Sequence, residues 1–525
     1  MSEQKRFSLV GDTSSQGDVI EFLSNPASYD ATVRSVDKHE THGSIVFLAG
    51  ERAYKLKRAV RFPYMDYSTV AQRRQMCMRE LEVNRRTAPM LYLGVRPVVR
   101  SGPGSLCFGT EADGGSALDW VVVMQRFDQD ALLEKIRVSG WLTRPLMRLL
   151  AETVAEFHRN AEIAPGFGGA DGIRAVIEEN TAILKGKMGK PFDAELVHRY
   201  ETESLLLLAG MTSLLEERRR QGRVRRCHGD LHLNNICMID NRPVLFDAIE
   251  FSDNFACIDV LYDLAFLLMD LDRHGLRDHA NNVLNRYVEV TDEHVGLTAL
   301  PLFLSCRAAI RAHTAVVAAD AVNDARAREA GRQHATQLLE RALAYLAKSL
   351  PRLIAVGGVS GTGKTTLAYD IAPLLGAPPG AIVIRSDIIR KQLMNVSETM
   401  RLPESAYAPA VTAKVYARIA ELVTTTLASG YSVIADAVYG KESERRKLTE
   451  IAERAGVAFD GLWLEASPHL LESRIRARSG DASDATVDVL RAQLQFVSTP
   501  QDWIHVSAAA PAKETIKEGR RVLGC

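Results

Sequence analysis

The chain has 525 residues, 46% of them hydrophobic and 25% charged, which is the composition of a globular protein with a substantial core. A chain of this length is expected to form about two to four domains. Its 65 basic and 65 acidic residues cancel, which excludes a global electrostatic attraction to nucleic acid or to a membrane surface. We therefore expect neither nucleic acid nor a membrane as a partner.

The N-terminal residues and the cysteines indicate a compartment. The first residues, M-S-E-Q-K-R, contain no apolar signal core, and the longest apolar stretches are shorter than a membrane-spanning helix. The seven cysteines are odd in number and scattered, without a C-x-x-C pair, which favours reduced thiols over a disulfide or zinc framework. These features predict a cytoplasmic protein, and they leave its oligomeric state open.

The chain before residue 348 divides into a mixed segment and a mostly helical one. In the mixed segment, about 1–130, alternating patterns predict strands at 44–48, 52–57 and 120–126, and a helix at 69–86. In the second segment, about 131–347, periodic patterns predict helices at 143–158, 195–219 and 297–347, interrupted by a β-like region at 224–250.

A dense cluster of reactive side chains lies at 227–235, C-H-G-D-L-H-L-N-N. An aspartate beside a phosphoryl acceptor can orient and deprotonate a hydroxyl, and Asp230 has this potential. Asn235 and Asp247, which ends the next apolar stretch, offer oxygen ligands for magnesium. His228 and His232 have no cysteine partner at a suitable spacing, which argues against zinc. A hairpin with polar turn residues is the alternative interpretation.

The pattern H-G-D-x-x-x-x-N, followed by an aspartate at a strand end, resembles the aminoglycoside phosphotransferase family, a branch of the protein-kinase-like fold. The resemblance implies that Asp230 is the catalytic base, that Asn235 and Asp247 are magnesium ligands, and that His228 is a structural residue of the loop. Asp247 is followed by A-I-E and not by a glycine. The flexible regulatory switch of protein kinases is therefore not implied.

The resemblance also requires a lysine on an early strand and a glutamate on the next helix. Lys55 and Lys57 lie on the same face of the predicted strand, because strand residues alternate between faces. We expect Lys55 to contact the ATP phosphates, with Lys57 as the reserve candidate. Glu80 is the expected partner, with Glu82 close behind. The alternative is that these residues are solvated charges on an exposed strand and helix.

Two further features qualify the resemblance. Asp259 and Asp263 resemble the helix that braces the catalytic loop in the family, or else they are solvated or capping carboxylates. Six arginines within 297–347 disfavour an acidic pocket for a polycationic drug. The identity of the acceptor stays open among sugars, choline-like alcohols and other hydroxyl compounds. These arginines are Arg307, Arg311, Arg326, Arg328, Arg332 and Arg341.

A domain boundary is predicted at 348–351, K-S-L-P, because proline stops the preceding helix. The expected domains are 1–348 and 349–525. Strand-like runs then alternate with helical ones, which predicts a parallel sheet flanked by helices. The strand-like runs are 353–356, 381–385, 432–435 and 462–465, and the helical runs are 365–375, 410–427, 442–455 and 470–478.

Residues 358–365, G-V-S-G-T-G-K-T, match the P-loop pattern G-x-x-x-x-G-K-[ST] between a predicted strand and a predicted helix. The backbone N–H groups of such a loop surround phosphates, its lysine reaches the outer phosphates, and its threonine ligates magnesium. The alternative is a glycine turn without a ligand. The candidate nucleotide-binding residues are Gly358, Ser360, Gly361, Thr362, Gly363, Lys364, Thr365 and Thr366.

Other residues of this half narrow its chemistry. Asp387 ends the second strand, where small-molecule P-loop kinases keep the carboxylate that contacts the acceptor hydroxyl, and it is a candidate catalytic residue. Asp436 ends an apolar strand and can hold magnesium, while Ala437 replaces the glutamate expected of an ATPase motor. Arg474 and Arg478 resemble the lid of these kinases, or form one basic helix face. The half resembles the gluconate-kinase and zeta-toxin-like group.

Together the two resemblances, over 40–345 and 351–505, match bacterial fusions of aminoglycoside phosphotransferase with ATP-binding or kinase modules. They predict a two-domain protein of α+β and α/β class. The expected function is an enzyme with two sites for ATP and Mg²⁺, each transferring the γ-phosphoryl group to a hydroxyl group of a small molecule. The alternative is that one module is an ATP sensor or an ATPase that controls the other.

Overall fold

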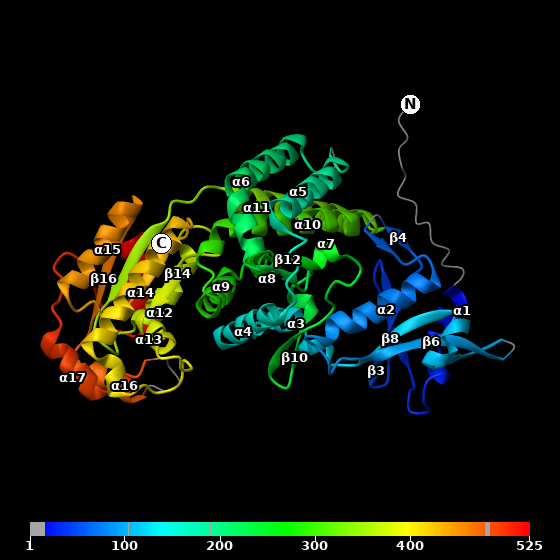
Figure 1. Cartoon of the computed structure of the whole chain (residues 1–525), viewed down its shortest axis with the longest axis horizontal. Coiled ribbons are helices and arrows are strands. Elements are labelled where there is room, and N and C mark those ends of the chain that lie inside the picture. Colours follow the sequence, from blue (N-terminus) through cyan, green and yellow to red (C-terminus); the bar gives the residue numbers. More distant parts are fainter. Residues whose placement is uncertain (1–15, 63, 103, 189–190, 478–482) are drawn as a thin grey trace. The chain divides into compact units, whose positions relative to one another are not determined.

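The computed structural model describes residues 16–62, 64–102, 104–188, 191–477 and 483–525, and Figure 1 shows its elements. The chain forms two compact units. Unit 1 comprises the described residues of Met1–Leu142, Thr153–Gly172 and Glu217–Leu267, and unit 2 those of Thr143–Glu152, Ile173–Glu216 and Leu268–Cys525. The antiparallel sheet of one part and the parallel sheet flanked by helices of the other match the α+β and α/β classes that the sequence predicts. All seven cysteines are free thiols, as expected.

Unit 1 is built on an antiparallel sheet of six strands in the order β1-β2-β3-β8-β6-β7. Successive residues face opposite sides of a strand. Accordingly, Phe47 and Leu56 pack under α1, whereas Leu48 and Ala53 pack under α2. The elements are α1 (Gly17–Ser24), β1 (Val36–Glu40), β2 (Ser44–Ala49), β3 (Arg52–Lys57), α2 (Val70–Arg85), β6 (Tyr92–Gly102), β7 (Ser105–Phe108) and β8 (Asp119–Gln125).

The rest of unit 1 holds the loop that carries Asp230. Strand β9 pairs antiparallel with β12, and β10 with β11, so the loop is fixed at both ends by short strand pairs. The further elements are β4 (Arg61–Phe62), β5 (Met65–Asp66), α3 (Leu133–Val138), β9 (Val224–Arg226), β10 (Ile236–Ile239), β11 (Arg242–Leu245), α7 (Asp253–Ala256) and β12 (Cys257–Asp259). Helices α4 (Arg144–Asn160) and α8 (Val260–Arg273) contribute to both units.

The helices of the segment 131–347 differ from prediction at several places, because those at 169–185, 260–273 and 277–291 were not predicted. The single pattern at 297–347 forms two helices, α10 (Leu300–Asp320) and α11 (Ala325–Leu346). The break has a physical cause, because the Asp324 side chain accepts a hydrogen bond from Ala327 N (2.7 Å) and caps a new helix. The other helices are α5 (Gly169–Lys185), α6 (Ala194–Arg220) and α9 (Arg277–Thr291).

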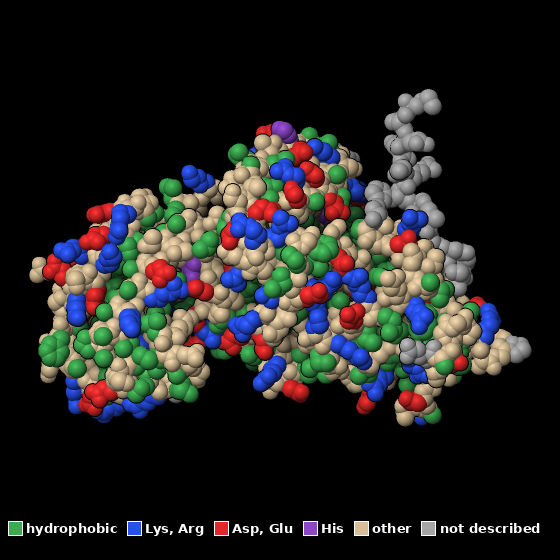
Figure 2. Space-filling view, in the orientation of Figure 1, with side chains coloured by type: hydrophobic (Ala, Val, Ile, Leu, Met, Phe, Trp, Pro, Cys, Tyr) green, Lys and Arg blue, Asp and Glu red, His purple; other side chains and the backbone are tan. Residues whose placement is uncertain are grey.

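In the part of the chain that the structure describes, one helical stretch, Val295–Asp320, is long and apolar enough to cross a membrane, and its most apolar window of 18 residues has a mean hydropathy of 1.3. However, 72% of its apolar window is buried within the protein. Burial of this kind is expected of a core helix. In Figure 2, acidic and basic side chains are interspersed over the face that is shown.

The second part of unit 2 is a parallel sheet of five strands, ordered β14-β15-β13-β16-β17. The connection from β13 to β14 runs toward one edge of the sheet, and those from β14 to β15 and from β15 to β16 run toward the other edge. Because such connections are right-handed, α12 is expected on one face of the sheet and α14 and α15 on the other. The strands are β13 (Arg352–Gly357), β14 (Ile382–Arg385), β15 (Val433–Asp436), β16 (Ala458–Glu465) and β17 (Ile504–Ser507). The helices are α12 (Lys364–Ile371), α13 (Ser386–Leu393), α14 (Pro409–Ala428), α15 (Glu442–Ala455), α16 (Pro468–Ala477), α17 (Val487–Phe496) and α18 (Ala512–Leu523).

Candidate functional site

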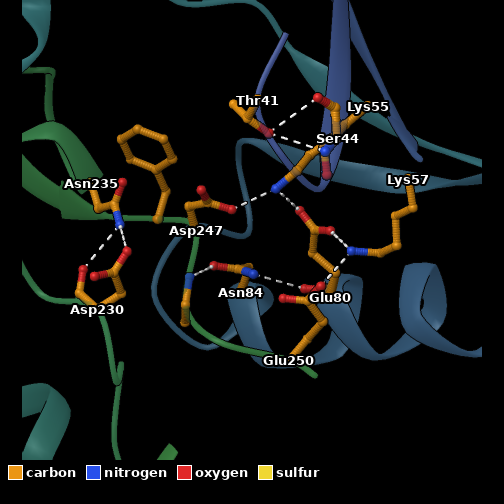
Figure 3. Close-up of polar contacts among 12 residues, drawn as sticks. Thr41, Ser44, Lys55, Lys57, Glu80, Asn84, Asp230, Asn235, Asp247 and Glu250 are labelled. Carbon is orange, nitrogen blue, oxygen red and sulfur yellow. Dashed lines mark hydrogen bonds and ion pairs between the residues drawn. The ribbon is translucent and has the colours of Figure 1, made fainter. Parts of the chain in front are cut away.

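The loop between β9 and β10 holds Asp230 and Asn235 against each other. Asn235 Nδ2 donates to the Asp230 backbone O and to its Oδ2, both at 3.0 Å (Figure 3). Gly229 has φ +84°, and a Cβ there would lie 2.8 Å from Phe255 O. Only glycine fits this turn without displacing backbone. The predicted base and its predicted neighbour are therefore brought together by a tightly specified turn.

Buried groups brace this loop from behind. Asp263 accepts hydrogen bonds from His228 N (3.1 Å) and Gly229 N (2.8 Å), and His158 Nε2 lies 3.1 Å from its Oδ2. The His228 ring Nε2 lies 2.9 Å from Phe246 O, in keeping with a structural role. Burial lowers the pKa of His228. The solvated interpretation of Asp263 is wrong, because the side chain is fully buried.

Asp259 is also buried, and its Oδ1 accepts from Leu261 N at 2.8 Å, so the capping interpretation is confirmed for this residue. Its Oδ1 and Oδ2 each accept from the Arg218 guanidinium at 2.8 Å. This fork-to-fork geometry ties α6 to the start of α8. Neither Asp259 nor Asp263 is a solvated carboxylate.

The predicted lysine and glutamate meet the predicted metal ligand. Lys55 Nζ lies 2.8 Å from Glu80 Oε1 and 2.6 Å from Asp247 Oδ1. Burial alone would lower the pKa of Lys55, but Asp247 and Glu80 together raise it well above its usual value. Lys55 is thus a permanent cation, which is what a contact to ATP phosphates requires.

Lys57 is not an interchangeable reserve for Lys55. Its Nζ lies 2.6 Å from Glu80 Oε2 and also forms an ion pair with Glu250, and its side chain is 1% exposed. Glu80 therefore bridges both lysines. Burial would raise the pKa of Glu80, but the two lysines lower it to about 2. Glu82 is exposed and takes no part.

The segment that begins at Asp247 is held by groups that sequence reasoning missed. Asp247 N donates to Tyr92 Oη (3.1 Å), and Ala248 N donates to Asn84 Oδ1 (2.8 Å). Glu250 Oε1 accepts from Tyr67 Oη (2.6 Å). The spacing of Glu250, three residues after Asp247, was the one available signal. Every one of these bonds fixes the segment, in keeping with its lack of a glycine.

The oxygen donors suit magnesium. Figure 3 shows Asp247 between the Asp230–Asn235 pair and Lys55. Asp247 has φ +62°, a conformation that aspartate and asparagine tolerate better than other non-glycine residues. Carboxylate and amide oxygens are the donors that Mg²⁺ prefers, so Asp247 and Asn235 fit the predicted ion.

In unit 2 the P-loop has the conformation that phosphate binding needs. Gly361 and Gly363 have φ +88° and +89°, and no atom of the described residues lies within 4 Å of a Cβ added at Gly363, which precedes α12. The space before the helix N-terminus is therefore open to an anion. Lys364 Nζ donates to Val359 O (3.1 Å), which folds its chain over the loop.

Of the other predicted P-loop residues, Gly358, Ser360 and Thr362 shape or fix the loop, and Thr366 is exposed. Gly358 has φ +135°, and a Cβ there would lie 2.5 Å from Leu464 O, so it shapes the turn. Thr362 Oγ1 donates to Val359 O (2.9 Å), and Ser360 N donates to Gln493 Oε1 (2.8 Å). Thr366 is exposed on the first turn of α12. Gln493 was missed, because it lies more than 100 residues further along the chain.

The predicted magnesium residues of this half touch each other. Thr365 Oγ1 donates to Asp436 Oδ2 at 2.6 Å. Burial raises the pKa of Asp436, although Lys364 and Arg385 act in the opposite direction. A hydroxyl and a buried carboxylate beside the P-loop lysine fit a magnesium ion.

Asp387 lies in the first turn of α13, directly after β14. Arg385, two residues before Asp387, is the register partner of Asp436 in the pairing of β14 with β15, so Asp387 follows the strand end next to the one that carries Asp436. Burial raises the pKa of both Asp436 and Tyr407, and the negative charge of Asp387 adds to each shift. Arg390 lies over the Tyr407 ring, 4.7 Å from its centroid. A catalytic role for Asp387 stays a prediction.

The two candidate lid arginines have separate outcomes. Arg474 Nη2 donates to Ala510 O at 3.2 Å, from helix α16. Arg478 lies outside the described residues. A lid role for both stays a prediction.

Two family models match separate parts of the chain. Residues 140–303 match the model of the phosphotransferase enzyme family, and residues 353–500 match the model of an AAA domain. The chain therefore joins a kinase-type phosphotransferase domain to a P-loop kinase-like domain, and ATP-dependent phosphoryl transfer is its general chemistry.

Relatives match this chain over almost its whole length. An uncharacterized protein of Mycobacterium tuberculosis (strain H37Rv) is 28% identical over 497 residues, 93% of this chain and 95% of the relative. An uncharacterized protein of Mycobacterium bovis matches with the same identity and coverage.

Solved structures match parts of the chain. A gluconokinase from Sinorhizobium meliloti 1021 is 25% identical, covering 33% of this chain and 93% of its own, with a TM-score of 0.25. A choline/ethanolamine kinase family protein from Mesorhizobium loti is 15% identical, covering 64% and 99%, with a TM-score of 0.37. Similarities at these scores support no assignment of substrate.

Proposed function

We propose that this chain, which joins a phosphotransferase-family domain to a P-loop kinase-like domain, binds ATP and Mg²⁺ at two sites and transfers the γ-phosphoryl group to hydroxyl groups of small molecules at each. The observation that carries the proposal is the ion-pair chain Glu80–Lys55–Asp247 beside the Asp230–Asn235 pair. It combines a fixed cation, two candidate metal ligands and a candidate base, the set that phosphoryl transfer to an alcohol uses.

In unit 1 the residues divide the work. Asp230 accepts the proton of the acceptor hydroxyl, and Asn235 Nδ2 keeps its carboxylate oriented. Lys55 donates to phosphate oxygens while Glu80 holds its Nζ in place. Asp247 and Asn235 would hold Mg²⁺, which neutralises phosphate charge when bound.

In unit 2 the phosphates are bound mainly by backbone N–H groups of the P-loop and by Lys364. Thr365 and Asp436 would hold Mg²⁺. Asp387, in the first turn of α13 directly after β14, orients the acceptor hydroxyl and accepts its proton. Ala437 leaves no carboxylate next to Asp436 to activate water, which favours transfer to an alcohol over hydrolysis.

The test uses the full chain and isothermal titration with MgATP. Wild type should bind two equivalents, and Lys364→Ala and Asp247→Asn should each bind one. Asn is chosen at 247 because it tolerates the positive φ. A single equivalent in wild type, unchanged in Lys364→Ala, would overturn the proposal.

A screen of hydroxyl compounds with γ-labelled ATP then separates the two reactions. Asp230→Asn should lower transfer in unit 1 by about 10²- to 10⁴-fold, the range for loss of a general base, and leave transfer in unit 2 intact. Asp387→Asn should do the reverse. Two bound equivalents, with label transferred by only one half, would instead support an ATP sensor in the other half.

A further inference from the structure

A glutamate between α13 and α14 links the P-loop site to helices outside the P-loop fold. Glu398 Oε2 lies 2.6 Å from Arg148 Nη2 in α4 and 2.9 Å from Arg286 Nη1 in α9. Its other oxygen, Oε1, lies 3.8 Å from Arg385 Nη1. All four residues belong to unit 2. Glu398 is therefore shared between two helix arginines and one arginine of the sheet.

Arg385 connects this glutamate to the candidate magnesium site. It is the last residue of β14, its side chain is 6% exposed, and its Nε lies 3.7 Å from Asp436 Oδ2. Its guanidinium is thus positioned between two carboxylates, Glu398 and Asp436. The two carboxylates face different nitrogens at 3.8 and 3.7 Å, so a movement of the rigid guanidinium toward one of them lengthens its contact with the other.

Helix α9 also grips the backbone of the same strand. Asn285 Oδ1 accepts from Val383 N at 2.7 Å, and Nδ2 of both Asn285 and Asn281 donates to Ala381 O at 3.1 Å. Both asparagines are buried. Strand β14 is an edge strand, so these amides satisfy backbone groups that no neighbouring strand pairs with.

Helix α9 also contacts α13, the helix that follows β14. Gln392 Nε2 at the end of α13 donates to Glu289 O in α9 at 2.8 Å. Arg286 in turn pairs with Glu152 of α4 (2.5 Å) and with Glu289. The helix contacts therefore extend on both sides of Asp387, from β14 to the loop after α13.

We propose that Arg148 and Arg286 are positioning residues of the P-loop site, acting through Glu398 on Arg385. By holding Glu398 beside Arg385, they keep that guanidinium from neutralising Asp436. The carboxylate of Asp436 then remains available to a cation. This role rests on the proposed phosphotransferase function of the P-loop half, and it makes that half dependent on helices α4 and α9.

The first test is Glu398→Gln in the full chain, with Asp230→Asn to silence the other site. Gln keeps the shape of a half-buried loop residue, so folding should be preserved. Without the charge, Arg385 pairs more closely with Asp436. The Mg²⁺ concentration that half-saturates ATP turnover should rise by roughly three- to tenfold, the range for one ion pair near a protein surface.

A double-mutant cycle tests whether Arg148 acts through Glu398. Arg148→Met should raise the half-saturating Mg²⁺ concentration by itself, because Glu398 loses its 2.6 Å partner. In the Glu398→Gln background it should add nothing. Arg332→Met is the matched control, since Arg332 pairs with Asp320 at 2.8 Å within α10 and α11 and should leave the Mg²⁺ dependence unchanged. Additive effects of Arg148→Met and Glu398→Gln would overturn the proposal.

A second measurement does not depend on catalysis. Amide hydrogen exchange of the nucleotide-free chain should rise over residues 385–402 in Glu398→Gln and in Arg148→Met, but not in Arg332→Met. Unchanged exchange and unchanged Mg²⁺ dependence would sink the positioning role. Raised exchange together with wild-type Mg²⁺ dependence would also reject it, leaving a structural contact. If no acceptor is found, the exchange data and the MgATP titration still test the positioning role of Arg148 and Arg286. A failure of the positioning role is therefore distinguishable from a failure of the proposed function.

Discussion

The two candidate phosphate sites are built from different materials. In unit 1, Lys55, Lys57 and Glu80 form a buried network in which side-chain charges compensate one another. In unit 2, uncharged backbone N–H groups surround the open space before α12, and the carboxylate of Asp436 has a raised pKa. The first arrangement depends on every charge having its partner. The second depends on backbone conformation, and the two sites should therefore fail in different ways.

The largest expected effect is loss of a charge from the unit 1 network. Lys57→Met removes the partner of Glu80 Oε2 and of Glu250, and leaves two buried carboxylates undercompensated. Breaking one partner of a buried pair costs about 3–5 kcal/mol. Urea denaturation followed in unit 1 by hydrogen exchange should show a loss of this size.

A matched lysine gives the control for this prediction. Lys38 pairs with Glu40 at 2.6 Å, but the two side chains are 37% and 49% exposed. Lys38→Met should cost less than about 1 kcal/mol, because solvent screens an exposed pair. Equal losses for Lys38→Met and Lys57→Met would show that the buried network does not set the stability of unit 1.

A smaller effect compares one glycine from each site. Gly229→Ala and Gly363→Ala both place a side chain at positive φ, which costs about 1 kcal/mol. At Gly229 the added Cβ also meets Phe255 O at 2.8 Å, so backbone must shift at a further cost of about 1–3 kcal/mol. Thermal unfolding should rank Gly229→Ala as the more destabilising change. The reverse order would contradict the geometry of the Asp230 loop.

The most gradual effect is the response to acid, which should have opposite signs at the two sites. The pKa of Glu80 falls from 4.5 to about 2 on folding, so its contribution to stability is present above pH 4.5 and is lost as the pH falls toward 2. The pKa of Asp436 rises above 3.8, so stability from this group is greatest below 3.8 and is lost as the pH rises through the folded pKa.

Neutral variants isolate these two contributions. Glu80→Gln should flatten the acid dependence of unit 1 stability between pH 4.5 and 2, and Asp436→Asn should remove the opposite slope from unit 2. Urea midpoints between pH 2 and 6, followed separately by hydrogen exchange in each unit, provide the measurement. Slopes of the same sign in both units would refute the comparison.

Sequence patterns predicted the elements that follow from local periodicity. The helix at 442–455 and the strand at 52–57 have the predicted bounds, and the P-loop lies between the expected strand and helix. Strand β17 was missed because its four residues, I-H-V-S, alternate over too short a run to indicate a strand by themselves. The helix pattern at 297–347 concealed the Asp324 cap, because one capping residue does not interrupt a periodicity.

The site residues that belong to contiguous motifs, at 227–235 and 358–365, could be predicted from the sequence. Lys55, Glu80 and Asp247 come from distant segments, and their meeting was inferred only through family resemblance. Asn84 and Tyr92 act through contacts to backbone amides of the 247–248 segment, and no pattern in the sequence marks such contacts. Glu398 is equally unmarked, since a single glutamate in a polar loop predicts solvent exposure.

The asparagine contacts on β14 bear on how the protein can be dissected. A fragment beginning near residue 349 would lack Asn281 and Asn285 and would present the N–H of Val383 and the C=O of Ala381 to solvent. Uncovered edges of this kind template intermolecular strand pairing. Recombinant versions of the P-loop half should therefore retain residues 277–291, or they are prone to aggregate during purification.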